Sequence, residues 1–227
     1  MNIIKPYARL LPLKYEPFVL DPFTREDGIA LLQRIEWCAR ISHRSEDSVT
    51  ESSYDRFLRS VVLEHGDWSV VEHASVSVDF YVDRGITHEL VRHRLFAFTQ
   101  ESTRFVNYEK KMPPSFVLPP LSDVAQQQAW TYSIEVAESQ YRRLLGTGVS
   151  PQIARSVFPN ALASRIIITG NLRNWRHFLL MRTTKEAHPQ MREVTIPLLE
   201  EFKRCIPIFY EDIEPMAKQA ENMRRGR

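Results

Sequence analysis

The densest group of side chains that could do chemistry lies between residues 92 and 104. The segment reads Arg92-His93-Arg94-Leu95-Phe96-Ala97-Phe98-Thr99-Gln100-Glu101-Ser102-Thr103-Arg104. Arginine guanidinium groups match phosphate and carboxylate oxygens in a bidentate geometry, and the neutral serine and glutamine groups suit a base or a sugar. The pattern alone leaves two interpretations open: a nucleotide-binding segment, or a charged and solvated helix end.

A zinc-binding helix is an alternative for the same region, and the spacing argues against it. The run His88-Glu89-Leu90-Val91-Arg92-His93 resembles the HExxH motif but is one residue too long. The second histidine must follow four residues after the first, so that both share a helix face. Arg92 holds that position, and a cation would repel Zn²⁺. We therefore predict that the protein binds no metal.

The two cysteines, Cys38 and Cys205, are too few for a disulfide scaffold or a four-cysteine zinc site. Both lie in apolar surroundings and are interpreted as small buried hydrophobic residues. Arg40 and Arg204 are near in sequence, so a reactive thiolate stays an open alternative. Reduced cysteines and a cytoplasmic location are the simplest interpretation.

Composition excludes several classes of protein. The 227 residues suffice for one large domain or two small ones, and 43% hydrophobic with 26% charged residues is typical of globular chains. A formal charge of +2 argues against a stable nucleic-acid partner. Seven glycines make glycine-rich phosphate loops improbable, and Gly146-Thr147-Gly148 matches neither nucleotide-loop pattern. We see no leader and no stretch of roughly 20 apolar residues, so no membrane partner is expected.

The elements that must position these residues form an α+β pattern without alternating βαβ units. Apolar spacing predicts helices, whereas runs of valine, isoleucine and aromatic residues predict strands. Four prolines predict an irregular lead-in over residues 1–24, and paired prolines predict a loop over 112–121. The predicted helices are 28–42, 52–64, 84–94, 122–145, a short one from 151, 171–181 and 191–205; the predicted strands are 70–83 and 166–169; residues 214–227 form a tail.

The series of motifs resembles the flavin-dependent thymidylate synthase family. Arg92-His93-Arg94, seven residues and then Ser102 reproduce its RHR-x7-S signature. The resemblance extends over about residues 29–205. Further matches in order are Ala39-Arg40-Ile41-Ser42, His65-Gly66, Glu72-His73, Ala154-Arg155, Gly170-Asn171, His177 and Met181-Arg182.

The resemblance implies a fold and an activity. The fold would be a single domain over residues 1–227, with a central, mainly antiparallel sheet flanked by helices. The activity would be reductive methylation of dUMP to dTMP without a cysteine nucleophile. Methylenetetrahydrofolate would supply the carbon, and NADPH would supply electrons through tightly bound FAD. The family also implies a homotetramer whose active sites are shared between subunits.

The resemblance also implies roles for individual residues. Ser102 and Arg182 are the candidate catalytic residues, although Ser102 has no histidine base within one turn and a binding role is expected for it. The residues implied in FAD binding are Ser42, Ser69, His73, Arg92, His93, Arg94, Asn171 and His177. Those implied in dUMP binding are Glu89, Gln100, Ser102, Thr103, Arg104, Arg155 and Arg182.

Three positions depart from the family pattern: Ala97 stands for serine, Thr99 for asparagine and Phe105 for tyrosine. These changes remove hydrogen-bonding groups but no charge. Two alternative activities therefore stay open: a related enzyme that releases a hydroxymethylated nucleotide, or one that methylates uridine in RNA. A protein of another class, which binds nucleotides or RNA without catalysis, is the remaining alternative.

Overall fold

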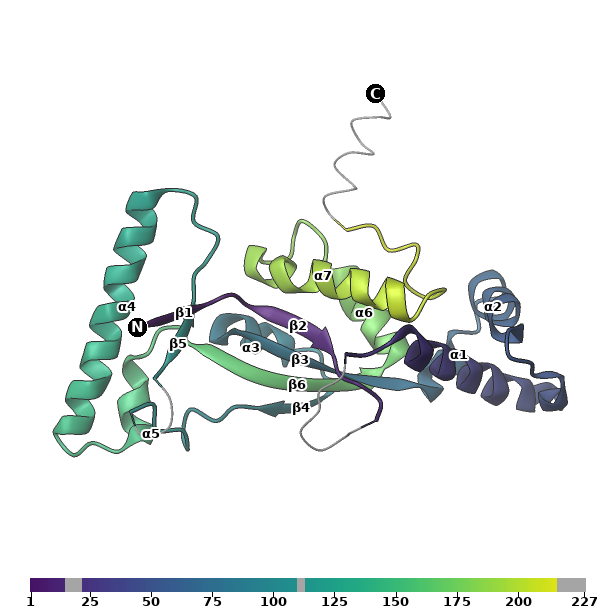
Figure 1. Ribbon diagram of the computed structural model, residues 1–227, viewed down its shortest axis with the longest axis horizontal. Helices are drawn as coiled ribbons and strands as arrows, with labels where there is room; N and C mark the ends of the chain where they lie inside the picture. The colour runs from purple at the N-terminus through teal and green to yellow at the C-terminus, as the bar shows by residue number, and fades with distance from the viewer. Residues whose placement is uncertain (15–21, 110–112, 216–227) are drawn as a thin grey trace, which may run out of the picture. The chain divides into compact units, whose positions relative to one another are not determined.

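The computed structural model describes residues 1–14, 22–109 and 113–215 (Figure 1). The chain divides into two compact units. Unit 1 contains Met1–Tyr7, Phe80–His93 and Phe98–Ile167. Unit 2 contains Ala8–Asp79, Arg94–Ala97 and the residues from Ile168 onward. The extent of the expected domain, residues 1–227, stays a prediction.

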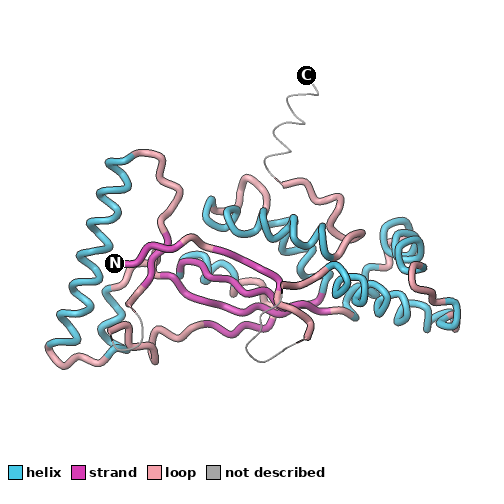
Figure 2. Tube along the Cα trace, in the orientation of Figure 1, coloured by secondary structure: helices cyan, strands magenta, loops and turns pink. Residues whose placement is uncertain are grey.

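The strands form two sheets (magenta in Figure 2). The larger has the order β2-β3-β6-β4 and is antiparallel, which confirms the predicted α+β fold class. The smaller is a parallel pair of β1 and β5, in which Asn2 faces Ser115 and Ile4 faces Val117. The strands are β1 Asn2–Ile4, β2 Tyr7–Leu10, β3 Ser75–Asp83, β4 Ala97–Gln100, β5 Ser115–Val117 and β6 Ala163–Asn171.

Alternating burial explains the long strands. In β3 the side chains of Val76, Val78, Phe80 and Val82 are all buried, two residues apart. Because successive side chains in a strand point to opposite faces, this spacing places them on one face. The predicted strand began at Val70, but Trp68–His73 is a 3₁₀ helix, η4, whose backbone closes tight turns from Asp67.

The prediction of an irregular lead-in over residues 1–24 is wrong at β1 and β2, whereas residues 11–14 and 22–24 contain no helix or strand, as predicted. β1 and β2 occupy residues 2–4 and 7–10, and Pro6 lies between them rather than inside either strand. The predicted loop over 112–121 likewise contains β5, with prolines only outside it. Proline lacks a backbone N–H and so bounds strands, but short strands fit between prolines. Residues 15–21 and the tail from 216 lie outside the described residues.

Side-chain capping groups mark the first residues of α1 and α6. Thr24 and Asp27 form a reciprocal capping box at the start of α1. Asn171 caps α6 by accepting a hydrogen bond from the backbone N–H of Asn174 at 2.8 Å. The helices are α1 Arg25–Arg40, α2 Ser53–Leu58, α3 Arg84–Leu90, α4 Val124–Gly146, α5 Pro151–Ala154, α6 Leu172–Arg182 and α7 Pro189–Cys205. Shorter turns are η1 Ile41–His43, η2 Glu46–Ser48, the π-helical η3 Arg59–Glu64 and η5 Arg155–Val157.

Each unit has its own packed interior. In unit 1, α4 and α5 enclose an aromatic cluster in which the rings of Tyr141 and Phe158 stack at 4.4 Å. In unit 2, α7 packs against α1 and α6. Gly28 of α1 lies against the backbone of Cys205, where a Cβ atom would lie 1.7 Å from the carbonyl oxygen. Within the described residues, no helix combines the length and hydropathy needed to cross a bilayer.

Candidate functional site

The predicted site residues fall into two groups, one in each unit. The group in unit 1 contains Glu89, Arg92, His93, Gln100, Ser102, Thr103, Arg104 and Arg155. The group in unit 2 contains Ser42, Ser69, His73, Arg94, Asn171, His177 and Arg182. Most residues with a predicted role in dUMP binding are therefore in unit 1, and most with a predicted role in FAD binding are in unit 2.

The RHR segment lies beyond the helix on which the spacing had placed it. α3 ends at Leu90, and two backbone bonds at 3.1–3.2 Å close a turn through Arg92 and His93. The guanidinium groups of Arg92 and Arg94 are exposed and form no ion pair with the residues that the structure describes. Exposed cations without a carboxylate partner are available to an anionic ligand.

Hydrogen bonds determine the orientation of the Gln100 amide. The Thr87 hydroxyl donates to the carbonyl oxygen of Arg84 at 2.9 Å, so the oxygen of Thr87 must act as an acceptor towards Gln100. The Gln100 Nε2 group donates to Thr87 at 3.0 Å and to the Ser164 hydroxyl at 3.1 Å. Both amide hydrogens are thus used internally, and Gln100 presents its oxygen, an acceptor, to a ligand.

Three side chains on either side of Ser102 anchor the turn that carries it. Glu101 accepts a hydrogen bond from the Tyr108 hydroxyl at 3.1 Å. Thr103 is buried and accepts a hydrogen bond from Arg155 at 2.7 Å, while Arg104 donates to Gln152 at 3.2 Å. Burial raises the pKa of Tyr108, so its phenol stays protonated and remains a donor. The Ser102 hydroxyl has no hydrogen-bond partner among the described residues.

A cavity of about 480 Å³ adjoins this turn in unit 1. Arg84 and Arg155 both line it, and none of the described residues lining it is acidic. Two cations with neutral hydroxyl and amide groups suit a phosphate or another anion. The remaining lining residues are Thr103, Gln152, Ile153, Ser156, Phe158, Pro159, Asn160 and Leu162.

Sequence reasoning missed Arg84, Gln152 and Asn160 as cavity residues. Arg84 had one available signal, because it is the first residue of α3. A cation is electrostatically disfavoured at a helix N-terminus, so an arginine there indicates another role. Gln152 and Asn160 carry no comparable signal, because neither is charged and neither belongs to a recognisable motif.

The structure assembles the group in unit 2 around the first turns of α6. η4, which carries Ser69 and His73, packs against α6, and the Leu172 N–H donates to the Ala74 carbonyl oxygen at 3.0 Å. The segment Arg94–Ala97 lies against the same helix, because the Asn174 amide donates to the Leu95 carbonyl oxygen at 3.2 Å. Ser69, His73 and His177 are exposed.

Contacts of Glu72, Arg173 and Phe96, none of which has a predicted role, connect this group. Arg173 of α6 and Glu72 of η4 form an ion pair at 2.6 Å. The Phe96 ring packs edge-on against Trp175 at 4.6 Å and covers Gly170.

Ser42 lies apart in η1, where its hydroxyl donates to the Ala39 carbonyl oxygen at 2.9 Å. Arg182 ends α6 and its side chain is half-buried.

The donor set in unit 2 fits a flavin nucleotide. An unpaired arginine, exposed hydroxyls and exposed imidazoles provide the positive charge and hydrogen bonds that a diphosphate and a flavin ring require. Asn171 uses its oxygen to cap α6, which leaves its amide hydrogens for a ligand. The Cys205 thiol is poorly suited to chemistry, because burial raises its pKa and lowers its thiolate fraction; Cys38 is only partly buried, contrary to the prediction.

Comparisons with known proteins show the family of the chain. Residues 30–208 match the family model described as thymidylate synthase complementing protein. A flavin-dependent thymidylate synthase of Mycobacterium sp. (strain JLS) is 34% identical, with 86% of this chain and 85% of the relative aligned. The enzyme of the same name from Corynebacterium diphtheriae is 32% identical over 79% of this chain and 78% of its own.

The fold is similar to that of a solved protein. A UMP/dUMP methylase from Streptomyces cacaoi, crystallised with 5-Br dUMP, superposes with a TM-score of 0.73. The alignment covers 93% of this chain and 96% of that one, at 23% sequence identity. At this identity the comparison supports the fold.

Proposed function

The chain belongs to the flavin-dependent thymidylate synthase family, and from that premise we propose that it methylates dUMP to dTMP. Methylenetetrahydrofolate is the carbon donor and NADPH the reductant, acting through FAD. The observation that carries the proposal is the cavity lined by Arg84 and Arg155, beside the turn that holds Ser102. Its charge and lining suit a nucleotide monophosphate.

The substrate is held by unit 1. The dUMP phosphate is close to a dianion at neutral pH, and arginine forks bind such a group bidentately. Arg84, Arg104 and Arg155 supply them. The oxygen of Gln100 accepts the N3–H of uracil, whereas cytosine would present an acceptor there. Ser102 donates its hydroxyl to the nucleotide and does not act as a nucleophile.

The cofactor is held mainly by unit 2. FAD supplies the reducing electron pair that turns the transferred carbon into a methyl group. The residues that bind it are Ser42, Ser69, His73, Arg92, His93, Arg94, Asn171 and His177. Positive charge from arginine stabilises anionic groups of the ligand, because opposite charge favours the charged form.

The remaining roles concern activation of the nucleotide and the assembly. Arg182 and Glu89 contact dUMP, with Arg182 stabilising negative charge on the base. No cysteine adds to the substrate, which the burial of Cys205 supports. The enzyme acts in the cytoplasm as a homotetramer whose subunits share active sites.

The mass of the nucleotide product tests the activity. The protein is incubated with FAD, NADPH, methylenetetrahydrofolate and dUMP, and the nucleotide is analysed by liquid chromatography and mass spectrometry. We expect a product heavier than dUMP by one methylene, formed only with NADPH. A hydroxymethyl product would identify the hydroxymethylating relative. Unchanged dUMP from flavin-loaded protein would overturn the proposed reaction.

Arg92→Ala tests the flavin assignment. We expect this variant to lose its bound FAD during purification, because an exposed cation that contacts the cofactor is gone. The matched control is Arg143→Ala, which removes an exposed arginine of α4 that has no predicted role. Full FAD occupancy in Arg92→Ala would show that the RHR segment has another role.

A further inference from the structure

The residues after α7 form a clasp, which we define as Ile208–Asp212. Phe209 and Tyr210 are fully buried, although the segment has no regular secondary structure. Ile208 has a φ of +81°, in the left-handed region that a β-branched residue rarely adopts. Such a backbone persists only where surrounding contacts determine it, so the contacts of the clasp must be strong.

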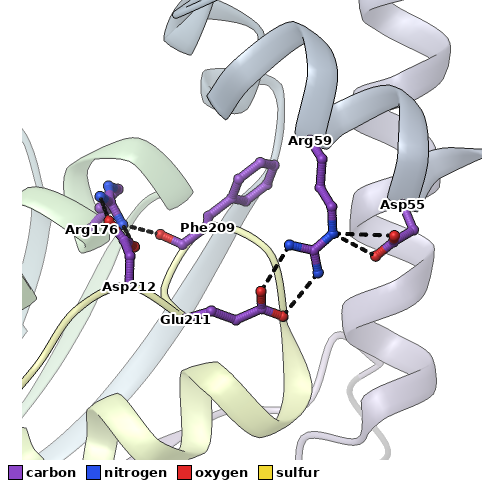
Figure 3. Close-up of polar contacts among 6 residues, drawn as sticks. All are labelled: Asp55, Arg59, Arg176, Phe209, Glu211 and Asp212. Atoms are coloured by element: carbon purple, nitrogen blue, oxygen red, sulfur yellow. Dashed lines mark hydrogen bonds and ion pairs between the residues drawn. The ribbon is translucent and has the colours of Figure 1, made fainter. Parts of the chain in front are cut away.

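The clasp binds α6 at two points. Both oxygens of the Asp212 carboxylate pair with the Arg176 guanidinium at 2.6 Å, and the same guanidinium donates to the Phe209 carbonyl oxygen (Figure 3). The Tyr210 hydroxyl donates to the Leu172 carbonyl oxygen at 2.9 Å. The Arg176 side chain is 14% exposed whereas the Asp212 side chain is 61% exposed, so the bidentate geometry, rather than exclusion of water, makes this contact specific.

The clasp also binds η4. The Phe209 ring lies 6.1 Å from the Trp68 ring, and the Arg176 guanidinium lies over the face of Trp68 at 4.7 Å. Arg176 therefore stacks on an aromatic ring of η4 while it pairs with a carboxylate of the clasp. A single guanidinium thus joins α6, η4 and the clasp.

Each contact point adjoins a residue with a proposed role in FAD binding. Trp68 precedes Ser69, Leu172 follows Asn171, and Arg176 precedes His177. We propose that Arg176 and Asp212 are positioning residues, which set the distance between η4 and α6 and so place these three FAD ligands. The inference rests on the proposed function, since it concerns the same cofactor.

A second ion pair of the clasp serves as an internal control. Glu211 pairs with Arg59 of η3 at 2.9 and 3.2 Å, and Arg59 also bonds Asp55 (Figure 3). η3 carries no predicted site residue. Breaking this pair loosens the clasp without touching Arg176, so it should not move the FAD ligands.

The experiment compares Asp212→Asn with Glu211→Gln. Each change removes one carboxylate charge at nearly constant shape. We expect Asp212→Asn to weaken FAD binding by about tenfold in a flavin-fluorescence titration and to shift the absorption bands of the bound flavin. Glu211→Gln should change the FAD dissociation constant less than twofold. Arg176→Lys keeps the charge but loses the planar fork, and should resemble Asp212→Asn.

The possible outcomes are distinguishable. Equal effects of the two carboxylate variants on FAD affinity, or an unchanged flavin spectrum in Asp212→Asn, would overturn the inference and leave the proposed function intact. If the wild-type protein fails to bind FAD, the proposed function falls and the inference with it. Thermal unfolding of each variant verifies that it is folded at the temperature of the titration.

Discussion

The proposed substrate region of unit 1 and the proposed flavin region of unit 2 are built differently. In the substrate region, Gln100, Thr103, Arg104 and Arg155 are bonded to neighbouring side chains, and Thr103 and Arg155 line a cavity. In the flavin region, the exposed Ser69, His73 and His177 make no side-chain bonds to the residues that the structure describes. The side chains that make close contacts there are Trp68, Arg173 and Arg176, which lie in the elements that carry these exposed residues.

This difference predicts which substitutions should weaken ligand binding in each region. In the substrate region the proposed ligand-binding groups are themselves preorganised, so removing one of them costs affinity directly. In the flavin region affinity depends on the placement of η4 and α6. Residues that never touch the cofactor should therefore matter more there.

The largest effect is expected for Arg155→Ala. A hydrogen bond to a charged group contributes about 1.5–3 kcal/mol, so the dissociation constant for dUMP should rise about 10- to 100-fold. Calorimetric titration of flavin-loaded protein measures it. FAD affinity should stay unchanged, and Arg143→Ala again serves as the control. A parallel loss of FAD affinity would mean that the two regions do not act separately.

A smaller effect, confined to the flavin region, is expected for Gly170→Ala. The added Cβ would lie 2.3 Å from Cδ1 of the Phe96 ring, which is already packed against Trp175. Overpacking of this kind costs about 1–3 kcal/mol and should displace the segment that carries Arg94. Chemical denaturation and FAD titration should both report the change.

Gly146→Ala is the matched control, because nothing lies within 4 Å of its added Cβ. Its stability should be unchanged or slightly higher, since alanine has less backbone freedom to lose on folding. An equal loss of stability in both variants would contradict the role assigned to Phe96.

The smallest effect is expected for the free energy of unfolding at acidic pH. Hydrogen bonds from Arg176 and Arg59 hold the pKa values of Asp212 and Glu211 below their ordinary range. A carboxylate with a lowered pKa stabilises the folded state above its unfolded pKa of about 4, and this stabilisation is lost as pH falls through the folded value. The Asp212 side chain is 61% exposed, so its ion pair contributes about 0.2–1 kcal/mol to the free energy of unfolding.

Urea unfolding of wild type and Asp212→Asn measures this contribution. The difference in free energy of unfolding should be greatest near neutral pH and shrink as the pH falls below 4. A difference that grows on acidification would show that the Asp212 carboxylate does not stabilise the clasp.

Several features followed from local sequence. The helices of α1, α4 and α7 were predictable because apolar spacing over 10 to 20 residues reports one buried face. The signature from Arg92 to Ser102, together with the ordered series of motifs around it, indicated the family, which the comparisons confirm. Short strands were harder: β1 and β5 have three residues each, too few for a periodicity, and their pairing joins residues 113 apart in sequence.

The sequence by itself determined which residue types are available, their family and most of the helices, since these depend on neighbours along the chain. Only the tertiary structure decided which arginines share a cavity, which atom of Gln100 is left for a ligand, and that Arg176 stacks on Trp68. These features depend on contacts between distant segments. Ser164 lies 64 residues from Gln100, and Asp212 lies 36 from Arg176. Packing of the whole chain brings such groups within hydrogen-bonding distance, and no local pattern specifies that.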